Sequence, residues 1–262
     1  MRIVRGCLFL IGAVLLPVVL CQAAENPNIV VIFVDDMGYG DPQCFNPASK
    51  IPTQNIDRLA AQGMRFTDAH APGSLCHPSR YGLLTGRYPF RTKLPWRREP
   101  CIAEGRMTVA SLLKENGYRT AMVGKWHLGF DVEDYKNPPV EIVGGPADRG
   151  FDSYFGIPAS TDIPPYYYIR NKRVVRLPTD HIEDNRSEGW SPIQGAFWRA
   201  GGIAPDLKLI DVLPKFTDEA VAVLETHQNQ AAHQPLFLYL AYPAPHTPWL
   251  PTDEFLGKSK AG

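Results

Sequence analysis

The sequence predicts an α/β domain with a mainly parallel sheet flanked by helices, and three observations support this prediction. Short apolar runs rich in β-branched residues alternate with segments of helical periodicity, as in parallel strands joined by helices. The 262 residues are 44% hydrophobic and 21% charged, which suits a globular protein with a large core. Polar residues also follow directly on three of the predicted strands, where open α/β sheets bind their ligands.

The strands are predicted from three apolar runs. Residues 28–36 read NIVVIFVDD, a continuous run in which five residues are β-branched. Such a run is typical of a central strand that is buried on both faces. Residues 119–123 and 236–241 are shorter apolar runs, and we predict a strand for each.

Helices are predicted at residues 53–63, 108–117 and 217–227. In each segment a threonine stands at the first position as a candidate cap, and apolar residues recur on one face. A glycine ends the first two segments, as it commonly does at the end of a helix.

Between residues 131 and 211 the periodicity is weak, and the segment is rich in Pro, Gly, Tyr and Arg. We expect long loops with short strands lying over the edge of the sheet. Long irregular connections are uncommon in compact domains unless they build a binding site.

The first residues form a secretory signal peptide pattern. Arg2 and Arg5 precede an apolar run at 7–20, and the small residues Ala23 and Ala24 follow it. We therefore expect residues 1–24 to be removed and residues 25–262 to form one domain that is secreted or periplasmic, without stable membrane insertion. Lys and Arg total 27, as do Asp and Glu, so no net charge favours nucleic acid as a partner.

Three cysteines remain after the predicted cleavage, namely Cys44, Cys76 and Cys101. The odd number leaves at least one thiol unpaired or modified in an exported protein. The spacing leaves open whether Cys44 and Cys101 form a disulfide.

Cys76 has the sequence context of an electropositive cysteine. Pro78 suits the first turn of a helix, so Cys76 is expected at a helix N-terminus, where the dipole favours an anion. Arg80 adds a positive charge one turn further on. This pattern fits a nucleophile or a redox residue, whereas a lone cysteine is more often a buried structural residue.

The polar residues at the strand ends suggest further chemistry. Asp35 and Asp36 could together bind one hard cation, although an isolated Asp-Asp is commonly a solvated turn. Lys125 and His127 would face one point if their segment is extended, which suits an anionic ester. His246 stands in a proline-rich APHTP segment, so its imidazole is expected to be rigidly placed.

The segment from Cys76 to Gly86 fits C-x-P-S-R-x-x-L-L-T-G at every fixed position. This pattern resembles the signature of the type I, formylglycine-dependent sulfatases, and the chain resembles the N-terminal part of their arylsulfatase-like members. The resemblance runs from residue 28 to 248, apart from the loops between about 162 and 210. It is also carried by VDDMGYGD (34–41), PTQNIDRLAAQGMRFTDAHA (52–71), TGRYPFR (85–91), GYRTAMVGKWHLG (117–129), GFDSYFGIPAS (150–160) and APHTP (244–248).

The resemblance implies an alkaline-phosphatase-like sulfatase domain that hydrolyses sulfate monoesters. It implies that a formylglycine-generating enzyme oxidises Cys76 to formylglycine during maturation. It further implies one calcium ion, held by Asp35, Asp36 and the modified Cys76, and a sulfated small molecule or sulfated glycan as substrate.

The resemblance also implies roles for the remaining residues. Arg80 and Lys125 would bind oxygens of the sulfate or of the modified cysteine, and His246 would donate a proton to the leaving alcohol. His127 would take the proton whose loss restores the aldehyde. Ser160 matches a serine that contacts substrate in arylsulfatases.

Two alternatives remain. Related enzymes of the same superfamily cleave phosphate or phosphonate esters, and their sites also bind a tetrahedral anion. The chain could instead be an inactive fragment, because the Asp-Asn pair and the lysine that usually follow in sulfatases are absent after His246. The domain would then be incomplete at its C-terminus, and its sheet would expose a hydrophobic edge that favours aggregation.

Overall fold

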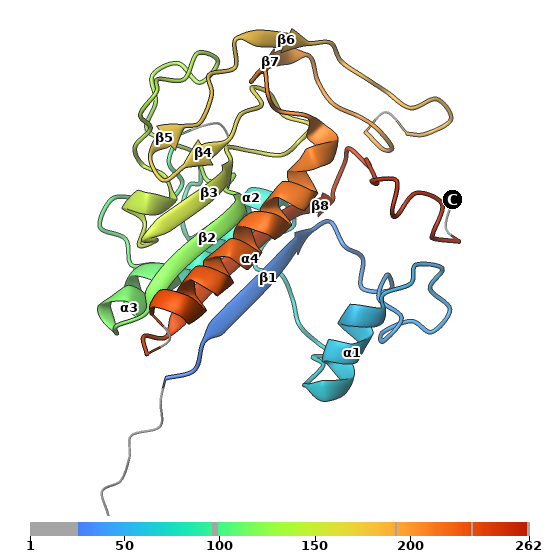
Figure 1. Cartoon of the computed structure of the whole chain (residues 1–262), viewed down its shortest axis with the longest axis horizontal. Helices are drawn as coiled ribbons and strands as arrows, with labels where there is room; N and C mark the ends of the chain where they lie inside the picture. The colour runs from blue at the N-terminus through green and yellow to red at the C-terminus, as the bar shows by residue number, and fades with distance from the viewer. Residues whose placement is uncertain (1–25, 96–98, 192, 232, 261–262) are drawn as a thin grey trace, which may run out of the picture.

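The computed structural model describes residues 26–95, 99–191, 193–231 and 233–260. Its main sheet has the order β1-β8-β2-β3-β4-β5 in the described residues (Figure 1). The first four strands in this order are parallel, and the two short ones are antiparallel. These strands are β1 (Ile29–Asp35), β8 (Leu236–Pro245), β2 (Arg119–Lys125), β3 (Ser153–Ile157), β4 (Ile169–Arg170) and β5 (Arg173–Val174). The predicted mainly parallel sheet is therefore confirmed.

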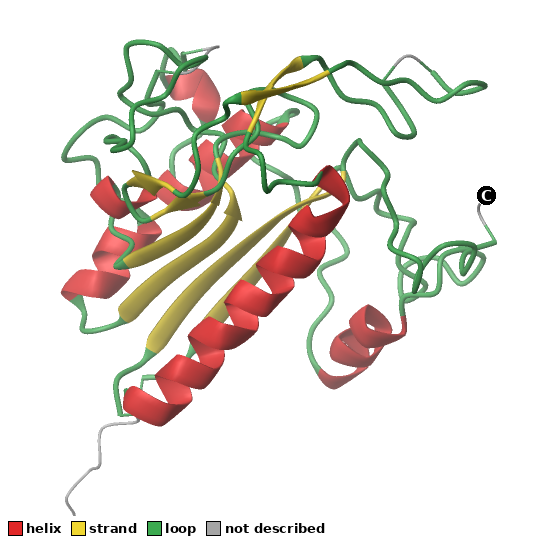
Figure 2. Ribbon diagram, turned by 45° about the horizontal axis from the view of Figure 1, so that its top comes forward, coloured by secondary structure: helices red, strands yellow, loops and turns green. Residues whose placement is uncertain are grey.

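Helices cover both faces of this sheet, as predicted (Figures 1 and 2). The long helix α4 (Val212–Gln230) crosses one face, whereas α2 (Cys76–Thr85) and α3 (Val109–Glu115) lie on the other. Helix α1 (Gln54–Gln62) stands apart, beyond β1, and buries none of its residues. The short 3-10 helices are Pro89–Arg91, Pro146–Asp148 and Leu209–Asp211.

The core fills the space between the helices and the central strands. Phe151 stacks against Phe237 and Tyr239 of β8, with ring centroids 6.0 and 6.3 Å away. Phe216 of α4 meets the ring of Phe155 of β3 edge-on. Because all five rings are buried, the central strands and α4 form one packed unit that holds the strand ends in place.

The prediction that residues 28–36 form a central strand buried on both faces is wrong. The strand exists as β1, but it pairs only with β8 among the described residues and lies at the edge of the sheet. The side chains of Val30 and Ile32 are 46% and 58% exposed. An apolar run indicates that a strand suits a buried position, but it does not say which neighbours cover it.

The largest difference between predicted and observed helix boundaries is at α4. The helix predicted at 217–227 begins at Val212, and Thr217 is an interior residue whose hydroxyl donates to the Leu213 carbonyl over 3.0 Å. Pro214 is compatible with this earlier start, because a proline is tolerated in the first turn of a helix. Thr108 does cap α3 as predicted, accepting a hydrogen bond from the Ser111 amide.

The segment at 131–211 consists largely of long loops and short strands, as predicted, but it also contains β3, a parallel strand of the main sheet that was not predicted. A small second sheet pairs β6 (Asp180–Ile182) with β7 (Gly201–Ile203). These loops lie beyond the carboxyl ends of the parallel strands (Figure 2). Loops at this end are placed to surround a ligand.

Glycine is required where β2 and β8 approach each other near their carboxyl ends. Gly124 of β2 has φ +119°, and a Cβ there would lie 2.0 Å from the Ala241 carbonyl oxygen of β8. A larger residue would therefore push the strands apart just before the polar residues that follow β2.

The predicted signal peptide, residues 1–24, lies outside the described residues. In the part of the chain that the structure describes, none of the helices combines the length and apolarity needed to cross a membrane. Cys44, Cys76 and Cys101 are free thiols, so the structure has no disulfide between Cys44 and Cys101.

Candidate active site

The carboxylate of Asp35, at the end of β1, is the buried centre of a charge cluster. The Lys125 ammonium, at the end of β2, donates to Asp35 Oδ2. The Arg80 guanidinium of α2 reaches the same oxygen over 3.2 Å and also donates to the Lys125 carbonyl over 2.8 Å. Both cations are fully buried. Two cations thus share one carboxylate, so the cluster carries one uncompensated positive charge.

The pKa of Asp35 is set by this cluster. Burial alone would raise the pKa of the carboxyl, but Lys125 and Arg80 outweigh burial and hold it below its ordinary value. Asp35 is therefore ionised at neutral pH, and the cluster keeps two positive charges and one negative charge.

Cys76 lies at the first position of α2, as predicted, with Leu75 as the N-terminal cap residue. Cys76 lines a cavity of about 790 Å³ at the carboxyl ends of the strands. His127 and His246 line the same cavity. Cys76 and two of the strand-end residues, His127 and His246, therefore line one space, which has the size of a small-molecule site.

Arg80, Lys125 and Asp35 do not line this cavity. Being fully or almost fully buried, they lie in the wall behind it and act on its contents through their charge. In this structure Arg80 and Lys125 both contact Asp35, and their contact with substrate oxygens stays a prediction.

His127 leaves the extended conformation, with φ 57°, so simple alternation does not describe its position. Its amide donates to the Pro158 carbonyl over 3.0 Å, which ties it to the loop after β3. Burial, followed by the charges of Lys125 and Arg80, lowers the pKa of the imidazole well below its usual value. Its Nδ1 atom is buried and has no hydrogen-bond partner among the described residues. His127 is therefore neutral at pH 7 and able to accept a proton.

His77 lies beside His127, with ring centroids 6.0 Å apart, and also lines the cavity. Burial and the Lys125 charge lower its pKa as well. The cavity wall thus holds two imidazoles whose protonation is opposed by the same buried cation.

His246 is fixed by backbone and side-chain contacts after β8. Its amide donates to the Asp35 carbonyl over 2.9 Å, and its Nδ1 lies 2.8 Å from the Thr247 carbonyl. The Ser160 hydroxyl is 3.2 Å from the same Nδ1. Ser160 thus contacts His246 in this structure, and its contact with substrate stays a prediction.

Asp36 differs sharply from Asp35, although the two are adjacent. It has φ 63° and a side chain that is 62% exposed, with Oδ2 3.7 Å from His246 Nε2. The strand ends between the two residues, which turns Asp36 outward.

Asp35 and Asp36 supply only part of what a calcium site needs. Their oxygens are the donor type that calcium prefers, but calcium takes about six to eight oxygen ligands. One oxygen of Asp35 is already shared by two cations. In the described residues, no group of three or more His, Cys, Asp or Glu side chains is arranged to hold a metal. The residues present therefore do not make a complete calcium site.

Sequence reasoning missed Asp162 and Arg199, which also line the cavity. Asp162 is buried, and Arg199 donates to its carboxylate and to its carbonyl. Both belong to the loops at about 162–210, where the sequence showed neither periodicity nor a motif, so no signal marked them.

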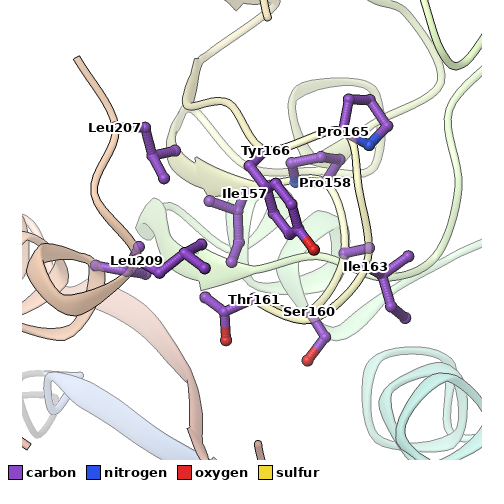
Figure 3. Close-up of a pocket in the computed structure, with 11 residues that line it drawn as sticks. Ile157, Pro158, Ser160, Thr161, Ile163, Pro165, Tyr166, Leu207 and Leu209 are labelled. Carbon is purple, nitrogen blue, oxygen red and sulfur yellow. The ribbon is translucent and has the colours of Figure 1, made fainter. Parts of the chain in front are cut away.

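A second, much smaller cavity of about 10 Å³ lies beneath the loop after β3 (Figure 3). Ile157, Tyr166, Leu207 and Leu209 surround it, and Ser160 stands at its margin (Figure 3). It is about the size of one water molecule and is a packing void that cannot hold a substrate. Its apolar wall anchors the loop that carries Ser160 and Asp162.

Together these features suit covalent attack on an anionic ester. A candidate nucleophile lies at a helix N-terminus, a buried positive charge lies behind it, and one neutral and one hydrogen-bonded imidazole line the same cavity.

Comparison with known proteins agrees with a site for an anionic ester. A family model described as Sulfatase matches residues 27–262. The chain is 36% identical over 272 residues to the N-acetylgalactosamine-6-O-sulfatase of Bacteroides thetaiotaomicron, covering 92% of this chain and 52% of that protein. It is 37% identical over 254 residues to arylsulfatase A of Bos taurus, covering 92% and 45%. The chain thus spans about half the length of these curated relatives.

Solved structures also superpose on this chain. One from work on glycosaminoglycan metabolism by Bacteroides thetaiotaomicron superposes with a TM-score of 0.76 at 34% identity, covering 90% of this chain and 54% of that one. Another, in complex with its substrate D-glucosamine-2-N,6-O-disulfate, superposes with a TM-score of 0.59 at 25% identity, covering 88% and 37%.

Proposed function

Because the chain belongs to the sulfatase family, we propose that the protein hydrolyses sulfate monoesters with a nucleophile derived from Cys76. The observation that supports this most directly is the buried charge behind Cys76. Arg80 and Lys125 share one carboxylate, so the site has a net positive charge before any substrate enters. A monoester of sulfate carries one negative charge, which matches that excess.

The histidines provide the proton transfers in this proposal. The lowered pKa of His127 keeps its imidazole neutral, so it can act as the general base. His246, held by the Thr247 carbonyl and the Ser160 hydroxyl, is the candidate donor to the leaving oxygen. The two rings line one cavity, so a substrate bound there can contact both.

We further propose that Cys76 is oxidised to formylglycine by a formylglycine-generating enzyme, since the segment after it fits C-x-P-S-R. The aldehyde supplies, when hydrated, an oxygen nucleophile in place of the thiol. The position at the start of α2 suits this use, because the helix N-terminus stabilises negative charge on that oxygen.

Calcium is proposed as the accompanying cofactor, with Asp35 and Asp36 as two of its ligands. The donor type supports this, but the number of donors in the described residues does not complete the site. A separate possibility, an inactive half-site, rests on that same shortfall and is decided by the activity test below.

Sulfated sugars are the substrate class that we favour. The B. thetaiotaomicron relative is named for an N-acetylgalactosamine 6-O-sulfate, and two structural neighbours were solved with a sulfated glucosamine and with a neocarrahexaose. The cavity of about 790 Å³ has room for a monosaccharide ring. We also propose export from the cytoplasm, on the signal-peptide pattern at 1–24.

The test compares turnover of 4-nitrophenyl sulfate and 4-nitrophenyl phosphate, in protein co-expressed with a formylglycine-generating enzyme. Mass spectrometry of the peptide containing residue 76 reports the conversion of thiol to aldehyde. We expect multiple turnovers of the sulfate, loss of turnover in Cys76→Ser, and no loss in the matched variant Cys44→Ser. Preference for the phosphate would favour the phosphohydrolase alternative, and no turnover despite full conversion would favour the inactive half-site.

A further inference from the structure

The cavity that holds Cys76 also contains a carboxylate that the proposed reaction does not use. Asp162 lines this cavity, yet its side chain is only 6% exposed. Its Oδ1 is buried and has no hydrogen-bond partner among the described residues. A buried charged oxygen without a donor is unfavourable, so it requires a partner such as a water molecule, an ion or a ligand, or a functional role.

The other oxygen of Asp162 is fully engaged by Arg199. Arg199 donates through Nη1 to Oδ2 and, over 3.1 Å, to the Asp162 carbonyl. Its side chain is 51% exposed, and it lines the cavity beside Asp162. An arginine has five N–H donors, and the hydrogen bonds described for this one use Nη1 alone. The pair therefore combines a buried acceptor without a donor, Oδ1, with unused donors in the wall of one cavity.

The position of this pair is fixed before any ligand binds. The Ile163 amide donates to the Ser160 carbonyl over 3.1 Å, which folds the loop after β3 into a turn around Asp162. The Tyr166 hydroxyl donates to the Arg199 carbonyl over 2.8 Å, and its ring belongs to the apolar cluster of Figure 3. Preorganised groups lose little entropy on binding.

A role of Asp162 in orienting His246 is less favoured by the geometry. Oδ1 of Asp162 is 3.9 Å from His246 Nδ1, which is beyond hydrogen-bond range. The same Nδ1 already has the Thr247 carbonyl at 2.8 Å and the Ser160 hydroxyl at 3.2 Å. His246 is held without Asp162, so Oδ1 is left available.

We propose that Asp162 and Arg199 form a subsite for hydroxyl groups of a sugar, next to the position of the sulfate ester. Asp162 Oδ1 accepts a hydrogen bond from one hydroxyl, and the free N–H groups of Arg199 donate to a neighbouring oxygen. Sugar hydroxyls both donate and accept, so an acceptor beside a donor matches a pair of them. The Asp162 carboxylate would repel any anionic group other than the sulfate ester that entered this subsite. The subsite therefore favours a neutral part of the sugar.

This inference rests on the proposed function and narrows it to sugar sulfates over simple aryl sulfates. A sugar binds both the sulfate site and this subsite, whereas an aryl sulfate has no hydroxyl for Asp162. A site built to bind a hydroxyl discriminates strongly against ligands that lack it, because its buried polar atom then stays unpaired.

The experiment measures kcat/KM for N-acetylgalactosamine 6-sulfate and for 4-nitrophenyl sulfate in wild type, Asp162→Asn and Arg199→Lys. The matched control is Glu219→Gln, which alters a carboxylate–arginine pair with Arg170 away from the cavity. We expect Asp162→Asn to lose about tenfold to a hundredfold more on the sugar sulfate than on the aryl sulfate. Arg199→Lys keeps the positive charge and should show the same selective loss of kcat/KM on the sugar sulfate. This variant therefore tests the proposal even if Asp162→Asn fails to fold. Equal losses on both esters, or no loss on the sugar, would overturn the proposal.

A binding measurement separates this inference from the proposed function. Saturation-transfer NMR with N-acetylgalactosamine 6-sulfate needs no turnover, so it can be read even if neither ester is hydrolysed. Binding by wild type and Glu219→Gln that is lost in Asp162→Asn supports the subsite. Absence of binding to wild type, or equal binding by all three, contradicts it.

Discussion

The amide of His246 donates to the carbonyl of Asp35 over 2.9 Å, and this bond joins the end of β8 to the end of β1. It continues the parallel pairing of the two strands, in which Asp35 lies opposite Pro245. The candidate proton donor is therefore positioned by the same backbone that carries the buried carboxylate. Any change that loosens the end of β1 should displace both.

Replacing Asp35 by Asn should strongly destabilise the protein. The substitution removes the one carboxylate shared by Lys125 and Arg80 and leaves two buried cations facing each other. We expect the free energy of unfolding to fall by about 3–5 kcal/mol, the usual effect of breaking a buried ion pair. Urea denaturation followed by circular dichroism measures this.

The matched control for that variant is Asp36→Asn. Asp36 is adjacent in sequence, but its side chain is 62% exposed, so its loss should change the free energy of unfolding by less than about 1 kcal/mol. Equal effects of the two variants would contradict the assignment of the buried charge to Asp35.

Acid should destabilise the fold through His127. The pKa of this imidazole is lowered in the folded state, chiefly by burial, while the unfolded chain titrates near pH 6.5. Below that pH the unfolded state binds a proton that the folded state does not, so the free energy of unfolding falls as the pH falls. One such group contributes a slope of up to about 1.4 kcal/mol per pH unit.

His127→Gln should flatten this dependence between about pH 6.5 and 5. Chemical denaturation at a series of pH values measures the slope in both proteins. His181→Gln is the control, because His181 is exposed and should leave the slope unchanged. A His127→Gln profile that coincides with wild type would show that His127 does not remain neutral in the folded protein.

The sequence predicted the parts of the site that depend on local pattern. Cys76 at the start of a helix follows from Pro78, and the approach of His127 and His246 to one cavity follows from the polar residues at the end of each strand. These features depend on residues that are close together in the chain, so the pattern of a single sequence is enough to predict them.

The structure differs where distant packing decides. The local sequence does not determine that β1 lies at the edge of the sheet or that Lys125 is buried. Both features depend on which distant segments pack against these residues. Asp162 and Arg199 meet only because the loops between β3 and α4 fold back over the cavity. Such a contact has no local sequence signal, and it was not predicted.

Calcium should bind this chain only weakly. Asp35 and Asp36 supply the donor chemistry, but the described residues bring no third acidic, histidine or cysteine ligand into a group with them. We expect a dissociation constant above about 1 mM, the weak end of calcium sites in proteins. Calorimetric titration of chelator-treated protein measures it, with Asp36→Asn as the variant that should abolish any residual binding. Micromolar binding would mean that further oxygen donors reach these carboxylates.

The chain expressed by itself should aggregate through the edge strand β1. Val30 and Ile32 are 46% and 58% exposed, and β1 pairs with no strand on its other side in the described residues. An open, apolar strand edge pairs readily with other chains, and charged residues on such a strand oppose this. The double variant Val30→Lys, Ile32→Lys should therefore reduce light scattering at equal concentration while keeping the melting temperature. Val31→Lys is the control, since Val31 is less exposed and packs against the core, so the same charge there should lower stability without the gain in solubility. A wild-type chain that stays monodisperse over the same range of concentrations would contradict the role of this edge.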